Sequence, residues 1–81
     1  MELAEIYTRL TGILRDVLNN DEVAATPELT AKQVRGWDSL ANVRVVVAVE
    51  EAFGVRFAAR EVQNLANVGE LAQLTKSKLE R

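Results

Sequence analysis

The chain has 81 residues, a net charge of −2 at pH 7 and 48% apolar residues. This length predicts a single domain over residues 1–81, and apolar residues mixed with charges of both signs are typical of a folded globular protein. The mildly acidic balance argues against a nucleic-acid-binding face, which needs clustered Lys and Arg, and no apolar run is long enough to cross a bilayer.

Cysteine and histidine are both absent. The chain therefore has no disulfide, no thiolate nucleophile and no Ser-His-Asp triad, and a zinc site of the usual kind is not expected. We expect no catalytic residues, no metal site and no enzymatic activity. The N-terminal residues are acidic and amphipathic, unlike a secretion signal, so these features together predict a cytoplasmic protein.

Residues 3–18 have apolar side chains at intervals of three and four, which predicts an amphipathic helix. A turn-forming Asn-Asn-Asp sequence follows it. The connection over residues 19–37 is long for so small a domain and is broken by Pro27. We expect Leu29 and Val34 to attach this connection to the core. The residues between them can form a short helical turn.

Residues 40–53 contain five valines, which on propensity alone favour a strand. Three features favour a helix instead. Asp38 and Ser39 are both good N-cap residues, the segment is long for a strand, and Gly54 supplies a residue that commonly follows the end of a helix. We therefore predict a helix over this segment.

The remaining segments complete an all-α pattern. A buried extended link with Val55 and Phe57 precedes a short helix over residues 58–65, and Asn67 and Glu70 resemble a capping box at the start of the last helix. The fold class predicted is a small four-helix bundle, with three main helices and a short third helix. The apolar face of the last helix is assigned to Leu71, Ala72, Leu74 and Leu79.

A helical wheel gives residues 40–53 two apolar faces. The face expected to point to the core contains Val45, Val46, Val49 and Phe53. The opposite face contains Leu40, Val43 and Val47, among Arg44, Glu50 and Glu51. A surface helix needs only one apolar stripe, so the second is either buried in a crowded bundle or forms a docking strip for other proteins.

Ser39 lies at the start of this second face, and three roles are considered for it. As an N-cap it would do no more than begin the helix. As a nucleophile it lacks both the G-x-S-x-G elbow and a histidine base. As a modification site it offers an accessible hydroxyl, and a phosphate there would lie near unpaired N–H groups and the positive end of the helix dipole.

The Asp38-Ser39-Leu40 motif, placed between a long loop and a helix ending in Glu-Glu-Ala-Phe-Gly-Val, resembles the acyl carrier protein family. The resemblance covers essentially the whole chain and includes the Gly36-Trp37 prefix. It implies that Ser39 carries covalent 4′-phosphopantetheine, moved there from coenzyme A by a phosphopantetheinyl transferase that recognises Asp38. It also implies that acyl groups are bound to the arm's thiol as thioesters.

The resemblance makes the helix over residues 40–53 the element that partners recognise. The implied docking residues are Leu40, Val43, Arg44, Val47, Glu50 and Glu51, and the implied core residues are Val46, Val49 and Phe53. The implied partners are the transferase, an acyl-loading ligase or acyltransferase, and downstream synthases. We expect no nucleic-acid or membrane partner, and a monomer.

Two features depart from members that serve general fatty-acid synthesis, which are strongly acidic along this helix. The chain is nearly balanced in charge, and Arg44 stands where many relatives have an acidic residue. The resemblance therefore favours a stand-alone carrier of a specialised lipid, polyketide or polysaccharide-linked pathway. The alternatives are a peptidyl or aryl carrier of a peptide synthetase and an unmodified helical adaptor. We expect the Trp37 side chain to fix the long loop against the bundle by apolar packing. The alternative is that its ring contacts the cargo.

Overall fold

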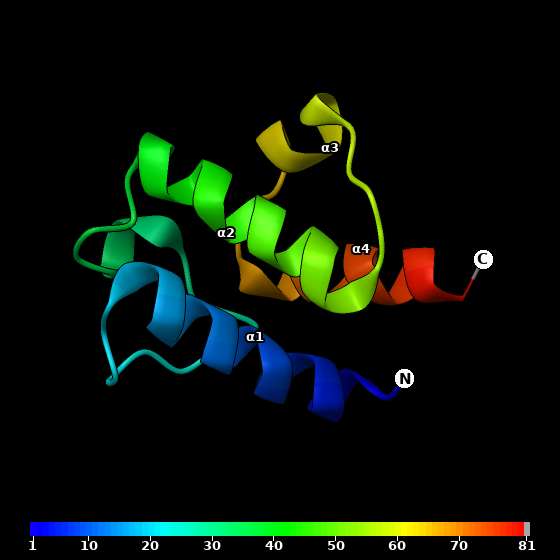
Figure 1. Ribbon diagram of the computed structural model, residues 1–81, viewed down its shortest axis with the longest axis horizontal. Helices are drawn as coiled ribbons and strands as arrows, with labels where there is room; N and C mark the ends of the chain where they lie inside the picture. The colour runs from blue at the N-terminus through cyan, green and yellow to red at the C-terminus, as the bar shows by residue number, and fades with distance from the viewer. Residues whose placement is uncertain (81) are drawn as a thin grey trace.

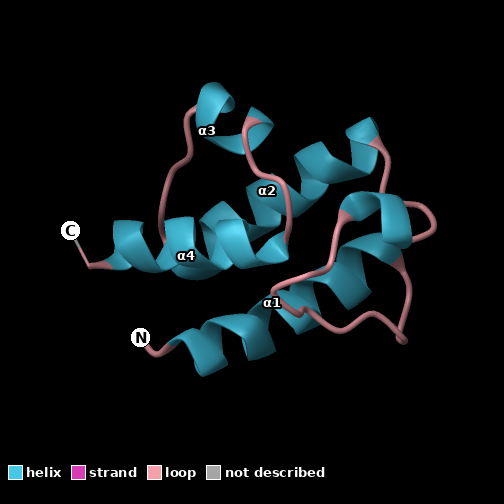
Figure 2. Ribbon diagram, turned by 180° about the vertical axis from the view of Figure 1, so that it is seen from behind, coloured by secondary structure: helices cyan, strands magenta, loops and turns pink. Residues whose placement is uncertain are grey.

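A computed structural model describes residues 1–80, and all regular structure in this range is helical. The three long helices pack together, and the short α3 lies on the side of α2 that faces away from α1 (Figure 1, Figure 2). The all-α bundle expected from the sequence is confirmed. None of the helices within residues 1–80 is both long enough and apolar enough to cross a membrane. The elements are α1 (Leu3–Leu18), the 3₁₀ turn η1 (Ala31–Gln33), α2 (Ser39–Phe53), α3 (Ala59–Gln63) and α4 (Val68–Leu79).

The core forms where α1 meets α2 and α4. Its members recur at three- and four-residue intervals, so each long helix turns one apolar stripe inward. Burying one such side chain contributes about 1.5–3 kcal/mol, so the packing of these stripes is the main stabilising term. The largest fully buried apolar side chains are Ile6, Leu10, Leu14, Val45, Val49 and Val68.

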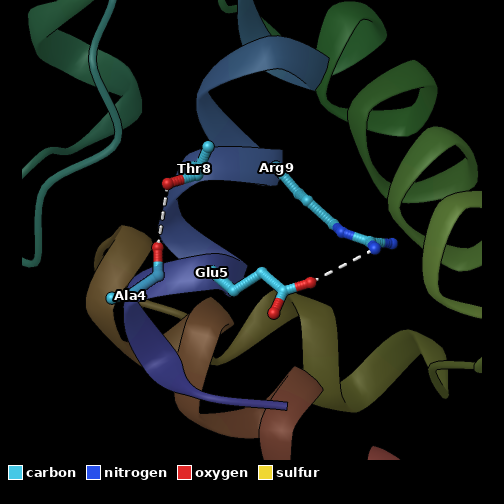
Figure 3. A network of polar contacts seen from close by, with 4 residues as sticks. All are labelled: Ala4, Glu5, Thr8 and Arg9. Atoms are coloured by element: carbon cyan, nitrogen blue, oxygen red, sulfur yellow. Dashed lines mark hydrogen bonds and ion pairs between the residues drawn. The ribbon is translucent and has the colours of Figure 1, made fainter.

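Two polar contacts within α1 lie on its exposed surface (Figure 3). Arg9 pairs with Glu5 over 3.3 Å, and the Thr8 hydroxyl donates to the Ala4 carbonyl oxygen over 3.0 Å. The Arg9 guanidinium carbon also lies 5.9 Å from the centre of the Phe53 ring. This cation–π contact connects α1 with the C-terminal end of α2.

The valine-rich segment is a helix, as predicted, and both of its ends have specific caps. Oδ1 of Asp38 accepts a hydrogen bond from the Ala41 N–H over 2.8 Å. At the other end Gly54 has a φ of +68°, and its N–H donates to the Glu50 carbonyl oxygen over 2.8 Å. A left-handed residue after the last turn favours glycine, so Gly54 ends α2 at Phe53.

The capping box predicted at α4 is half confirmed. Oδ1 of Asn67 accepts from the Glu70 N–H over 2.9 Å, but Oε1 of Glu70 accepts from the Ala66 N–H (2.7 Å), one residue upstream of the cap. Further along α4, Thr75 is fully buried, which the pattern did not predict. Its hydroxyl donates to the Leu71 carbonyl oxygen over 2.8 Å, so this buried polar group is satisfied.

The long loop is attached to the start of α4. The N–H of Val68 donates to the Leu29 carbonyl oxygen (2.8 Å), and the N–H of Gly69 donates to the Pro27 carbonyl oxygen (3.1 Å). These bonds satisfy N–H groups that the first turn of a helix leaves without partners. Val34 is buried, and η1 provides the short helical turn considered between Leu29 and Val34. The third helix is shorter than the predicted residues 58–65.

Two glycine substitutions test how the loop meets α4. A Cβ at Gly69 would lie 2.8 Å from the Pro27 carbonyl oxygen, whereas a Cβ at Gly12 would have no neighbour within 4 Å. We expect Gly69→Ala to lower the free energy of unfolding by about 1–3 kcal/mol through this clash. Gly12→Ala, in the exposed interior of α1, should raise it by about 0.5–1 kcal/mol. Urea unfolding of both variants measures the difference, and equal effects would contradict the close approach.

Candidate functional site

A tight turn over residues 34–37 leads into α2. The N–H of Trp37 donates to the Val34 carbonyl oxygen over 3.2 Å, and Gly36 has a φ of +88°. Glycine with positive φ at the third position of a four-residue turn is typical of a type II turn. The turn brings Trp37 directly to the first residues of α2.

Trp37 holds this turn against the bundle. Its half-buried side chain packs on the core, and its indole N–H donates to Oδ1 of Asn42 over 3.0 Å. Because Asn42 lies in α2, this bond ties the turn to the helix that it precedes. These contacts support the role expected for Trp37, which is to fix the long loop against the bundle.

Asp38 is the N-cap of α2 and Ser39 is the first residue of the helix. The N-cap role considered for Ser39 is therefore filled by its neighbour. The Ser39 side chain is exposed, and its hydroxyl makes no hydrogen bond within residues 1–80. The N–H groups of Ser39 and Leu40 have no acceptor within the helix. The electrostatics at this end of α2 therefore favour a negatively charged group on the hydroxyl.

A cavity of about 440 Å³ has Ser39 in its wall. Its lining comes from α2, α3, the start of α4 and the loop around η1. Trp37, Val62 and Leu65 contribute apolar surface to this lining. The hydroxyl therefore lies next to a space in which part of an attached molecule can be sheltered.

The cavity corrects one residue of the predicted core face of α2. Val46 was placed with the core residues, but it is half-buried and lines the cavity, whereas Val45, Val49 and Phe53 are buried. The contribution of Val62 to the lining was missed. The one available signal was the apolar spacing of Val62 and Leu65 in the helix predicted over residues 58–65, and this spacing does not show which neighbour they face.

The opposite face of α2 carries three exposed apolar side chains. Leu40, Val43 and Val47 are 69%, 60% and 45% exposed, and we call these three residues the outward strip. Apart from Met1, they are the only large apolar side chains in residues 1–80 that are exposed. The alternative in which a crowded bundle buries this face is therefore wrong. A small apolar patch with a polar rim is typical of an interaction surface.

The three charged residues assigned to docking have different surroundings. Arg44 and Glu51 are exposed and form no ion pair within residues 1–80. Glu50 is half-buried, and its Oε2 accepts a hydrogen bond from the Phe57 N–H over 2.8 Å. The Glu50 carboxylate thus holds the link after α2 in place, which leaves it less available to a partner than Arg44 or Glu51.

Comparisons with known proteins agree with this geometry. Residues 8–75 match the family model described as a phosphopantetheine attachment site. The chain is 42% identical to an acyl carrier protein of Acidothermus cellulolyticus over 82% of this chain and 79% of that protein. It is 31% identical to an acyl carrier protein of Helicobacter pylori over 84% and 87% of the two chains. Its fold matches the solution NMR structure of a holo acyl carrier protein from Geobacter metallireducens with a TM-score of 0.88 and 38% identity, covering 94% of this chain and 87% of that one.

The fold and the match define a phosphopantetheine attachment domain. Within that class, the chain belongs to the acyl carrier protein family. It is a carrier and not an enzyme, and the cofactor of the family is covalently bound 4′-phosphopantetheine. Such carriers work with a phosphopantetheinyl transferase and with acyl-processing enzymes. The residues at the start of α2 fit this group, because the Ser39 hydroxyl is exposed and unbonded in a setting that favours a phosphodiester.

Two valine substitutions on α2 test the assignment of its faces. Val43→Asp should change the free energy of unfolding by about 0.5 kcal/mol or less, because Val43 is exposed. Val45→Asp places a carboxylate where the side chain is 1% exposed, and we expect it to prevent stable folding. Circular dichroism during thermal unfolding distinguishes the two. An unfolded Val43→Asp variant would mean that the faces are reversed.

Proposed function

We propose that Ser39 is the attachment point for 4′-phosphopantetheine and that the chain presents acyl groups on this arm to partner enzymes. The observation that carries the proposal is the position of the Ser39 hydroxyl, exposed and unbonded at the first residue of α2. When bound, the arm supplies a terminal thiol on which acyl groups form thioesters. The relatives are acyl carrier proteins, which favours acyl cargo over aminoacyl cargo.

Ser39 can provide the nucleophile for attachment, but the chain offers no base of the usual kind. The serine oxygen forms a bond to the phosphorus of coenzyme A that bears pantetheine, the bond from that phosphorus to adenosine 3′,5′-bisphosphate breaks, and the serine proton is released. No histidine is present in the chain, and one oxygen of Asp38 is engaged by the Ala41 N–H. We therefore expect the transferase to provide the group that accepts the proton. Asp38 caps α2, and we propose that the transferase recognises it.

The cavity beside Ser39 supports partial shelter of an apolar acyl chain. Its wall includes α3, which has five residues and no fully buried side chain. An ion pair connects α3 to the bundle, because Nζ of Lys78 in α4 lies 3.0 Å from Oε1 of Glu61 in α3. An element with so little buried surface opens at low cost, which allows cargo to enter and leave between α2 and α3.

Attachment at Ser39 is tested with coenzyme A and a broad-specificity phosphopantetheinyl transferase. Intact mass spectrometry should show one added phosphopantetheine on the wild type, and peptide mapping should place it on Ser39. Ser77, the other serine of the chain, is exposed in α4 and provides the matched control. We expect Ser39→Ala to abolish the modification and Ser77→Ala to leave it unchanged, because Ser39 alone lies at the start of a helix.

The same assay addresses Asp38. Asp38→Asn keeps an N-cap side chain but removes the charge, so slower transfer at unchanged thermal stability would support recognition of the carboxylate.

Modification of Ser39→Ala would refute the attachment site. A Ser39→Ala variant that retains full function in the cell would favour an unmodified adaptor instead.

We further propose that the carrier is cytoplasmic and serves a dedicated lipid, polyketide or polysaccharide-linked pathway, not general fatty-acid synthesis. Support comes from the nearly balanced charge and from Arg44, which is exposed beside the outward strip. The acylated holo protein should therefore be a poor substrate for a ketoacyl synthase of general fatty-acid synthesis, with kcat/KM at least about tenfold lower than for that enzyme's own carrier. Equal kcat/KM values for the two carriers would refute the dedicated role.

A further inference from the structure

The surface around the start of α2 has the opposite charge to the rest of the chain. Residues 31–49 contain three cations, Lys32, Arg35 and Arg44, and one anion, Asp38, which gives this segment a net charge of +2. Because the whole chain has a net charge of −2, the remaining residues carry −4. All four charged residues of the segment are exposed. A partner that approaches Ser39 therefore meets more cations than anions on this segment, and the next charged residues along α2, Glu50 and Glu51, lie toward its C-terminal end.

Two of these cations lie on either side of Ser39 along the chain. Arg35 is the second residue of the tight turn over residues 34–37, just before the start of α2. Arg44 is four residues from Leu40 and three from Val47, spacings that make side chains neighbours on a helix surface. Neither arginine forms an ion pair within residues 1–80, so both charges are available to another molecule.

We propose that the acyl-processing enzyme that docks on the outward strip has an apolar socket bordered by Asp and Glu carboxylates facing Arg35 and Arg44. The inference rests on the proposed function, since it concerns the enzyme that acts on the arm at Ser39. Three exposed apolar side chains are a small patch, so the contact is transient and much of its rate and selectivity comes from complementary charge. At the Ser39 end of the strip a socket bordered by Lys and Arg would face Arg44 with like charge, whereas Glu51, the exposed anion near Val47, lies toward the other end of α2.

A second copy of this chain is a poorer occupant of the same surface. A symmetric dimer built on the outward strip would place the same patch on both sides and bring the two Arg44 guanidinium groups toward each other. A nucleic acid is also a poorer occupant, because three cations provide few phosphate contacts and the rest of the chain is negatively charged.

The experiment identifies the docked enzyme and then measures its dependence on charge. A photo-crosslinking residue in place of Val43 in the holo protein captures the enzyme from an extract of the cell that makes this carrier. That enzyme is purified, and its Kd for the holo protein without the crosslinker is measured at about 0.05 M and about 0.5 M salt. We expect Arg44→Glu to weaken binding about tenfold or more at low salt, and high salt to reduce this difference.

Arg56→Glu is the matched control, because Arg56 is exposed, forms no ion pair within residues 1–80 and follows the C-terminal end of α2. It should change Kd by about twofold or less. The inference is overturned if Arg44→Glu binds as tightly as the wild type or more tightly, or if Arg56→Glu has the same effect. Capture of only a second copy of this chain, or of nothing, overturns it as well. These failures are distinct from failure of the proposed function, which is decided by whether Ser39 is modified.

Discussion

The packing of α2 against α1 buries Val45 and Val49 almost completely, and this burial fixes what the rest of α2 offers to solvent. A rotation of the helix that hid Leu40 and Val43 would expose these core valines, at a cost of about 1.5–3 kcal/mol for each side chain. The outward strip is thus held in place by the core beneath it. The same packing sets the direction of the helix, so that its first residue, Ser39, lies at an exposed end.

The site is supported at the middle and at the end of the long loop. Hydrogen bonds from Val68 and Gly69 to loop carbonyl groups hold the middle of the loop, and the Trp37–Asn42 bond holds its end. By contrast, α3 has no fully buried side chain. The domain therefore combines a well-fixed start of α2, where Ser39 lies, with one weakly held wall of the adjacent cavity. The role proposed for Ser39 needs this combination, because the serine would be presented in a constant geometry while cargo enters and leaves the cavity.

Local pattern predicted the elements well, and the details that depend on three-dimensional contact less well. The bounds of α1 were predicted correctly because its apolar residues repeat regularly and a turn sequence follows. For α2, the caps at Asp38 and Gly54 outweighed the strand propensity of the valines. Val46 was misassigned because a helical wheel separates two sides, whereas α2 also borders a cavity on its flank. The reach of Glu70 to Ala66 and the Trp37–Asn42 bond depend on side-chain conformations that sequence spacing does not encode. The roles of Ser39 and the docking residues remain proposals.

The central claim is that the start of α2, with the cavity beside it, is where the phosphopantetheine arm is held. A comparison of ¹H–¹⁵N NMR spectra of the apo and holo proteins tests it most directly. We predict that the largest shift changes fall on residues 37–42 and on cavity-lining residues such as Leu65, with α1 nearly unchanged. Changes centred on α1 or on the C-terminal half of α4, with residues 37–42 unaffected, would contradict the claim.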